Sequence, residues 1–165
     1  MSAIVALGSN LGDSARLLAE AMKRLQDFSS QPVLCSSFWR TSPVDCPPDS
    51  AAFINAVASL VPWPEETPES LLQKLLALER EFGRMPKQQL NEARPLDLDL
   101  IAFGGEVRTS RELTLPHPRA HSRRFVLQPL SEIAPDLLLP GQAKPVRQLL
   151  SELAGKEMVE KLPPP

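Results

Sequence analysis

The sequence predicts an α+β protein in which an antiparallel sheet carries helices packed on its faces. Two observations lead to this class. Short apolar runs bounded by glycine and proline alternate with two longer segments whose apolar residues recur at helical spacing. The expected order of elements is strand, helix, strand, strand, helix, strand, which is the order of the ferredoxin-like arrangement. At 165 residues the chain is long enough to bury a substantial core.

The first half of this order begins with a buried strand over residues 3–7. The loop 8–13 contains two glycines and ends in an aspartate placed to cap the amphipathic helix that we expect over residues 14–26. Residues 33–40 are typical of a second strand. After a proline-rich loop, residues 53–61 are typical of a third.

The second long helix has a clear start and a clear stop. Thr67 is a capping hydroxyl, Pro68 suits the first turn, and Glu69 is an acid at the positive end of the helix dipole. Gly83 is a natural C-terminal stop. The following stretch, residues 84–93, is polar and without periodicity, so we expect a loop.

The last part of the chain carries one long strand and several shorter elements. Residues 96–103 predict the fourth strand, and the two glycines at 104–105 predict a hairpin turn into residues 106–108. We expect another short strand over residues 125–127. Apolar residues at helical spacing from residue 146 to residue 153 predict a last helix, which ends before Gly155.

Composition limits the partners that the chain can have. The 18 basic and 20 acidic residues leave a net charge of −2, which argues against nucleic acid as a partner. No apolar run approaches the ~20 residues that span a bilayer, so we expect no membrane partner. Met1 leads straight into a strand with no basic leader, and Cys35 and Cys46 fit no disulfide framework or metal spacing. We therefore expect a cytoplasmic protein.

The chain shows no internal repeat and no linker. We expect residues 1–165 to form a single domain with a frayed tail over about residues 156–165. Nothing in the sequence indicates a coiled coil or another obligate interface, so a monomer is the default expectation.

Asp97 and Asp99 are the most informative residues, because they interrupt a run that is otherwise typical of a buried strand. Strand side chains alternate between faces, so both carboxylates share one face about 7 Å apart. Desolvating two charges is costly, and a hard divalent cation such as Mg²⁺ would stabilise the pair. A solvated sheet face with Arg94 as an ion-pair partner explains the same residues. The two acids alone leave both interpretations open.

Basic residues flank the acidic pair on both sides: Arg84, Lys87 and Arg94 before it, and His117, Arg123 and Arg124 after it. A transferred phosphate needs cations around a metal site to neutralise its oxygens. Solvated arginines are the usual alternative. The convergence of acids, cations and a polar loop on one stretch favours a phosphate site.

A second candidate site surrounds the proline-rich loop. A flat heteroaromatic ring needs an aromatic face, apolar walls and a few polar groups at its edge. Phe53, Val44 and Asn55, with the backbone of residues 41–44, could supply them. Phe53 as ordinary core and Asn55 as a satisfied buried amide explain the same pattern, and the residues alone favour that plainer interpretation.

Several blocks occur together and in order: residues 6–13, 36–41, 53–57, 78–79 with 83–84, Arg94 with 96–99, 115–118, and Arg123 with 125–130. In this combination, which extends from residue 3 to about residue 140, the chain resembles the 6-hydroxymethyl-7,8-dihydropterin pyrophosphokinase (HPPK) family of folate biosynthesis. The resemblance implies an HPPK-like three-layer αβα fold within the α+β class. It also implies transfer of pyrophosphate from ATP to 6-hydroxymethyl-7,8-dihydropterin, with release of AMP.

The resemblance implies roles for individual residues. Two Mg²⁺ ions are expected on Asp97 and Asp99, and the implied catalytic residues are Arg84, Arg94, Asp97, Asp99 and Arg123. The implied ATP-binding residues are Leu72, Glu79, Arg84, Lys87, Leu100, Thr114, His117 and Arg123. The implied pterin-binding residues are Thr41, Ser42, Pro43, Val44, Phe53, Asn55 and Phe125, with the ring held between the two phenylalanines.

The loop before the acids departs from the family pattern. The family usually has a second arginine two residues after the one that matches Arg84, where this chain has Pro86. A basic residue, Trp, Gly and Pro normally precede the match to Arg94, where this chain has Leu, Asn, Glu and Ala at 90–93. Some members also have an arginine at the position of Glu112. Because such loops close over the site, we expect slower or altered turnover and retained metal binding.

Two alternatives to this pyrophosphokinase stay open. One is a paralogue that acts on a different pterin or nucleotide. The other is a non-catalytic pterin- or nucleotide-binding protein that has lost the loop chemistry. The second is disfavoured by six residues that occur together: Arg94, Asp97, Asp99, Arg123, Phe125 and Asn55. A protein that only binds has little need for a pair of metal ligands.

Overall fold

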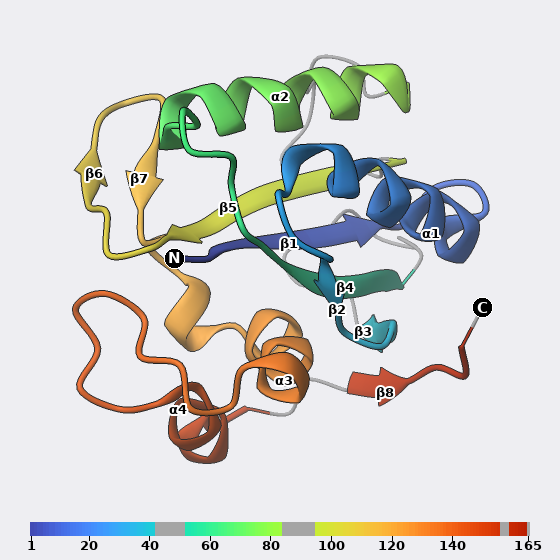
Figure 1. The fold of residues 1–165 in the computed structure, drawn as a ribbon. Coiled ribbons are helices and arrows are strands. Elements are labelled where there is room, and N and C mark those ends of the chain that lie inside the picture. The colour runs from blue at the N-terminus through green and yellow to red at the C-terminus, as the bar shows by residue number, and fades with distance from the viewer. Residues whose placement is uncertain (42–51, 84–94, 156–158, 165) are drawn as a thin grey trace.

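The computed structural model describes residues 1–41, 52–83, 95–155 and 159–164. Its elements in chain order are β1 (Ala3–Ser9), α1 (Ser14–Leu25), η1 (Gln26–Phe28), β2 (Leu34–Cys35), β3 (Trp39–Thr41), β4 (Phe53–Leu60), α2 (Pro68–Glu81), β5 (Asp97–Phe103), β6 (Arg108–Thr109), β7 (Thr114–Leu115), η2 (Ala120–Ser122), α3 (Arg124–Ile133), α4 (Val146–Glu152) and β8 (Val159–Lys161). In Figure 1, α1 and α2 lie above a central sheet, and α3 and α4 lie below it. The predicted α+β class with helices on an antiparallel sheet is confirmed.

The central sheet has the strand order β5-β1-β4-β3-β8, and β2 also pairs with β4. All of these pairings are antiparallel. Because β4 and β5 are both antiparallel to β1, they are parallel to one another, and α2 connects them across one face. In the same way α1 connects β1 to β2 and β3. Two such interleaved units are the ferredoxin-like arrangement that the order of elements predicts.

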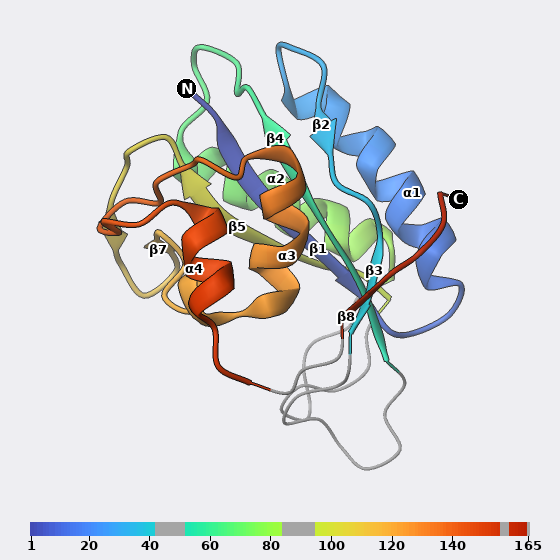
Figure 2. The same ribbon diagram turned by 90° about the horizontal axis from the view of Figure 1, so that it is seen from below.

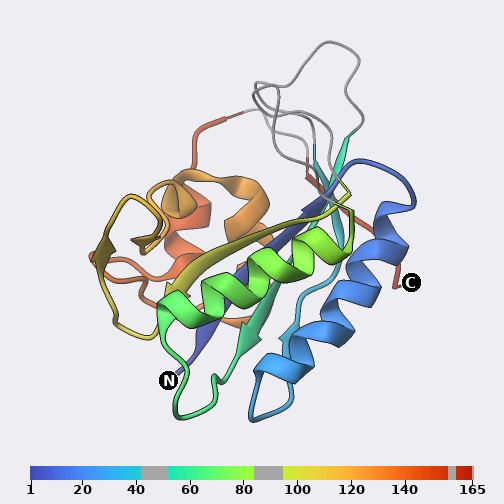
Figure 3. The ribbon, with the colours of Figure 1, turned by 90° about the horizontal axis from the view of Figure 1, so that it is seen from above.

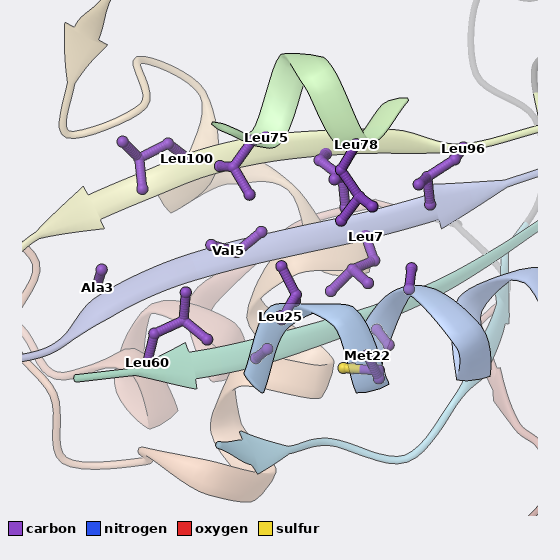
Figure 4. Close-up of a cluster of buried hydrophobic side chains, with 14 of the residues drawn as sticks. Ala3, Val5, Leu7, Met22, Leu25, Leu60, Leu75, Leu78, Leu96 and Leu100 are labelled. Atoms are coloured by element: carbon purple, nitrogen blue, oxygen red, sulfur yellow. The ribbon is translucent and has the colours of Figure 1, made fainter. Parts of the chain in front are cut away.

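Alternation along the strands divides their side chains between two cores. On β1, Val5 and Leu7 pack under α1 and α2, whereas Ile4 and Ala6 pack against α3 and α4. Figure 3 shows α1 and α2 crossing the upper face, and Figure 4 shows the leucines of α2, β1 and β5 that meet there. Figure 2 shows α3 and α4 on the opposite face. Both faces of the sheet are therefore covered.

The two long helices begin at the capping residues that the sequence indicates. The side chain of Asp13 accepts the N–H of Arg16 at 3.3 Å. Thr67 and Ser70 form a reciprocal capping box, in which each side-chain oxygen accepts the backbone N–H of the other residue. None of the helices in the described ranges combines the length and the apolar character needed to span a membrane.

The expected continuous strand over residues 33–40 is wrong, because the structure divides it into β2 and β3. Ser36 lies between them and takes part in the pairing with its side chain. Its Oγ accepts the N–H of Val57 at 2.9 Å, while its own N–H donates to the Val57 carbonyl. At the next residue, the N–H of Ser37 donates to the side chain of Glu132 on α3 instead of to a neighbouring strand. A contact with a distant helix therefore interrupts the strand.

The turn at residues 104–105 is present, but the expected hairpin is wrong. The N–H of Glu106 donates to the carbonyl of Phe103 at 3.0 Å, which closes the turn. The strand that follows, β6, pairs with β7 in a separate two-stranded sheet and not with β5. Gly104 instead donates its N–H to the carbonyl of Ser2, so the end of β5 is tied to the start of the chain.

The short strand expected over residues 125–127 is also wrong, because these residues are the start of α3. Val126, Leu127 and Leu130 form the buried stripe of this helix. Pro129 lies inside the helix, and an internal proline is a signal against helix in a sequence. A short apolar run before a proline therefore concealed a helix that packing stabilises.

The end of the chain differs from the frayed tail that we expected. Val159–Lys161 form β8, which pairs with β3 at the edge of the sheet. The N–H of Leu162 then donates to the carbonyl of Phe38 at 2.8 Å. The predicted last helix, by contrast, is confirmed as α4, Val146–Glu152.

Candidate functional site

Asp97 and Asp99 lie at the start of β5, at one edge of the sheet. Both are half-buried, whereas the leucines that alternate with them are buried under α1 and α2. Ile101, two residues beyond Asp99, packs in the core beside α3 and α4, so the acids belong to that face. The prediction that both carboxylates share one face is confirmed.

Glu79 on α2 holds the backbone between the two acids. Its side chain is buried, with 4% of its surface exposed, and Oε2 accepts the N–H of Leu98 at 2.7 Å. Within the described ranges β5 pairs with β1 alone, so this carboxylate satisfies a donor on the outer edge of the strand. The contact is a structural role for a residue that the resemblance implies as ATP-binding.

Gly8 on β1 lies between the start of β5, which carries the two acids, and the start of β4, which carries Phe53 and Asn55. It pairs with Asp97 on one side and with Asn55 on the other. Neighbouring strands lie about 4.8 Å apart, so the backbones of Asp97 and Asn55 are about 10 Å apart on one face. Asn55 Nδ2 donates to Thr41 Oγ1 at 2.6 Å, and Phe53 is half-buried two residues earlier. Asn55 and Phe53 therefore lie two strands away from the predicted metal ligands, and Thr41 lies one strand further out.

The start of α3 contributes an aromatic ring and a cation. Arg123 immediately precedes the helix, and Phe125 is its second residue. The guanidinium carbon of Arg123 lies 5.3 Å from the centre of the Phe125 ring, a cation–π arrangement. The helix therefore brings together two residues that the resemblance implies for phosphate and for pterin.

His117 lies close enough to Asp97 to interact with it electrostatically. The backbone N–H of His117 donates to the carbonyl of Ile101 on β5 at 2.8 Å, and the ring Nδ1 accepts the backbone N–H of Arg119. Burial lowers the pKa of His117, Arg123 and Arg119 lower it further, and Asp97 opposes them. The imidazole is therefore held neutral at pH 7, and with Nδ1 as acceptor its proton is on Nε2.

The remaining predicted ATP-binding residues in the described ranges lie on β5 itself or on elements that contact it. Leu100 is 4% exposed and packs in the core under α1 and α2, so its side chain does not face the acidic pair. Leu72, on α2, is partly buried against that same core, and Thr114, on β7, is exposed. α2 and β7 both contact β5. These residues are grouped around one edge strand.

Six predicted site residues lie outside the described residues: Ser42, Pro43, Val44, Arg84, Lys87 and Arg94. One residue that the structure places between the two halves of the site, Gly8, was not among the predicted residues. A glycine inside a buried strand often marks a close approach of another group. That signal was missed because the expected strand ended at Leu7 and Gly8 was assigned to the loop.

The fold and the position of these polar residues define the class: an α+β protein of ferredoxin-like topology with its polar groups at one end of one sheet face. Solved structures share this fold. The Plasmodium falciparum HPPK-DHPS triple mutant with STZ-DHP matches with a TM-score of 0.70 at 13% identity, over 92% of this chain and 43% of that one. The wild-type protein with pteroate matches with a TM-score of 0.71. The chain spans less than half of the length of these solved chains.

Comparisons at the level of sequence identify the family. A family model described as 7,8-dihydro-6-hydroxymethylpterin-pyrophosphokinase (HPPK) matches residues 4–135. The 2-amino-4-hydroxy-6-hydroxymethyldihydropteridine pyrophosphokinase of Haemophilus influenzae is 37% identical over 161 residues, 97% of this chain and 98% of that protein. The Synechocystis protein of the same name is 39% identical over 153 residues, 92% of this chain and 75% of that protein. The chain therefore belongs to the HPPK family.

Proposed function

We propose that this chain transfers a pyrophosphoryl group from ATP to 6-hydroxymethyl-7,8-dihydropterin, a step of folate biosynthesis. The observation that carries the proposal is the similarity to pyrophosphokinases such as that of Haemophilus influenzae over 97% of the chain. In this reaction the pterin hydroxyl oxygen bonds to the β-phosphorus of ATP. The bond from that phosphorus to the oxygen bridging to the α-phosphate breaks, AMP leaves with that oxygen, and the hydroxyl proton is released.

Asp97 and Asp99 would hold Mg²⁺, two ions in all. In the described part of the chain no group of three or more His, Cys, Asp or Glu side chains could hold a metal by itself. A pair of carboxylates fits Mg²⁺, which keeps several waters and takes its other ligands from substrate phosphates. When bound, the metal would neutralise negative charge on the phosphate oxygens. Glu79 supports the pair through the Leu98 N–H and so limits their movement relative to each other.

Arg123 and His117 would bind the ATP phosphates beside the acids. A guanidinium offers several donors to phosphate oxygens and stays charged at all relevant pH values. The neutral imidazole of His117 can donate from Nε2, because its Nδ1 is engaged by the Arg119 N–H. Positioning and charge neutralisation are the main sources of rate in phosphoryl transfer, and these two side chains supply both.

The pterin would bind between Phe53 and Phe125, with its edge read by Asn55 and by residues 41–44. A flat ring stacks well between aromatic side chains. The hydrogen bond from Asn55 to Thr41 orients the amide, so that its Oδ1 is available as an acceptor. The backbone separation of about 10 Å between Asn55 and Asp97 leaves room for a bicyclic ring and its hydroxymethyl group.

The loop of residues 84–94 is proposed to make turnover slower than in relatives with the usual loop sequence. The support is the sequence alone: Pro86 stands where an arginine is usual, and residues 90–93 lack the usual tryptophan. We expect the double variant Pro86→Arg/Asn91→Trp to release AMP faster than the wild type, since it restores a cation and an aromatic ring. An unchanged rate in a stopped-time AMP assay would count against this proposal.

We further propose that residues 1–165 work as one domain and as a cytoplasmic monomer. The absence of an internal repeat or linker in the sequence supports one domain, and the absence of a disulfide pattern supports the cytoplasm; the monomer is the default expectation. Light scattering during size-exclusion chromatography tests the oligomeric state, and a mass of twice 18.2 kDa would overturn the monomer.

One assay separates this function from its rivals. The protein is incubated with ATP, Mg²⁺ and the hydroxymethyl dihydropterin, and AMP is measured. AMP that forms only with this pterin supports the proposal. AMP that forms only with another acceptor indicates a paralogue with a different substrate, and pterin binding without AMP indicates a non-catalytic binding protein.

A further inference from the structure

We propose that Gly8 is a specificity-determining residue for the pterin, because the absence of its side chain keeps the Asn55 amide in its reading position. The inference rests on the proposed function, in which Asn55 reads the edge of the ring. Gly8 lies in β1, whose residues are buried along their whole length. It pairs with Asn55 of β4 in the sheet register.

Glycine is not required at this position by the backbone. Five other glycines have a positive φ, and Gly8 is not one of them. Its backbone conformation is therefore open to ordinary residues, and a strand interior generally disfavours glycine. The reason for glycine has to be sought in the space around it.

That space is limited by the side chain of Asn55. A Cβ built on Gly8 would lie 3.0 Å from Asn55 Oδ1 and 3.7 Å from Phe53 Cδ1. The second distance is an ordinary contact. The first is tighter than nine in ten real Cβ contacts, so Asn55 would have to move by a few tenths of an ångström.

Asn55 has little freedom to make this movement. It is 7% exposed, and its Nδ2 donates to Thr41 Oγ1 at 2.6 Å. Thr41 is itself 5% exposed. A displaced amide would weaken that hydrogen bond or turn its Oδ1 away from the ring edge, and either change alters the acceptor that the pterin N–H groups meet.

The effect should fall on the pterin and leave the nucleotide unaffected. The three nearest atoms to the added Cβ belong to Asn55, Phe53 and Ile54, all on β4. The acids lie on β5, on the other side of Gly8. A substitution at Gly8 should therefore change the binding of the pterin and leave the binding of ATP unchanged.

A double-mutant cycle on the full chain tests this inference. The variants are Gly8→Ala, Asn55→Ala and the combination, with KM for pterin, KM for ATP and kcat measured for each. Gly8→Ala is expected to raise the pterin KM about tenfold and to leave the ATP KM within about twofold. In the Asn55→Ala background the same change should add less than about twofold, because the group that it displaces is absent.

A matched control is Gly105→Ala. A Cβ at Gly105 meets nothing within 4 Å, and its φ is not positive, so all kinetic constants should stay at wild-type values.

An unchanged pterin KM in Gly8→Ala, an equal loss in both backgrounds, or a rise confined to the ATP KM would each overturn the inference. If Gly8→Ala alone fails to fold, folding of the double variant supports the contact with Asn55, and failure of both overturns it. Wild-type protein that forms no AMP would overturn the proposed function itself, and isothermal titration of pterin over the same variants would still test Gly8.

Discussion

The two faces of the central sheet are built from the same strands but carry different side chains at the end where Asp97 and Asn55 lie. Under α1 and α2 the apolar side chains continue to the strand ends, where Leu7, Leu96 and Leu98 are at most 4% exposed. On the face of α3 and α4 the corresponding positions carry Asp97 and Asn55. On β1 and β5 the first face is apolar as far as these leucines, whereas the other face is apolar at one end and polar at the other.

This difference shows how a small α+β protein can separate stability from chemistry. The core under the two long helices contains most of the large, fully buried leucines, and burial of each contributes about 2 kcal/mol. The opposite face can therefore carry polar groups at its end. Substitutions on the two faces should accordingly have different consequences.

The largest effect is expected from Asp97→Asn on the polar end. The change removes one charge at nearly constant size, so AMP formation should fall about 10³-fold, or about 4 kcal/mol of transition-state stabilisation. The midpoint of thermal unfolding should stay close to the wild-type value. AMP release over a Mg²⁺ titration and a thermal unfolding curve measure the two quantities.

The control for this change is Glu65→Gln, an exposed acid in the connection between β4 and α2. It should leave both quantities unchanged. Wild-type turnover in Asp97→Asn would mean that the polar end is not where the reaction takes place.

The opposite result is expected for Leu78→Ala on the apolar face. Leu78 is 1% exposed, and truncating a leucine in such a position costs about 3 kcal/mol of unfolding free energy. Denaturant unfolding followed by circular dichroism measures the loss. Leu76→Ala, at a half-buried position on the same helix, should cost clearly less, and equal losses would mean that burial in this core does not set the cost.

Glu79 tests the connection between the two faces, because it lies on α2 and contacts the strand of the acids. In Glu79→Leu the buried N–H of Leu98 loses its acceptor, at a cost of about 2 kcal/mol of unfolding free energy. Glu79→Gln keeps an oxygen that can accept this N–H and should cost less. If both variants lose the same stability, the hydrogen bond is not the important interaction.

The smallest effect concerns the pH dependence of stability through His117. Burial lowers its pKa, Arg123 and Arg119 lower it further, and Asp97 acts in the other direction. Because the folded protein resists protonation more than the unfolded chain, this contribution is fully present above about pH 6.5 and is lost as the pH falls through the folded-state pKa. Urea unfolding between about pH 4.5 and pH 8 should show a shallower decline for His117→Gln.

His121→Gln provides the comparison for this experiment, since His121 is an exposed histidine four residues further along. Its stability should follow the wild-type curve over the whole pH range. An identical decline in His117→Gln and the wild type would remove His117 from the explanation.

Several elements were predictable because their signals are local. The two capped helices and the long strands follow from periodicity and from residues such as Asp13 and Thr67, whose side chains bond to nearby backbone groups. The shared face of Asp97 and Asp99 follows from strand alternation alone. These features need no knowledge of the rest of the molecule.

Other elements were not predictable because distant residues decide them. The break between β2 and β3 depends on the contact of Ser37 with Glu132, 95 residues away along the chain. The start of α3 is a helix because it packs its apolar stripe against the sheet, and β8 exists because β3 offers an open edge. The conformational propensities of neighbouring residues cannot predict these long-range contacts.

The sequence by itself determined the α+β class, the order of the main elements, the paired acids and, through the ordered blocks, the resemblance to the HPPK family. Only the tertiary structure decided that Gly8 lies between Asp97 and Asn55 and that Glu79 holds the strand of the acids. The physical reason is the distance along the chain between the residues that interact. Periodicity and capping act between residues a few positions apart, whereas the site is formed where strands far apart in sequence meet across β1.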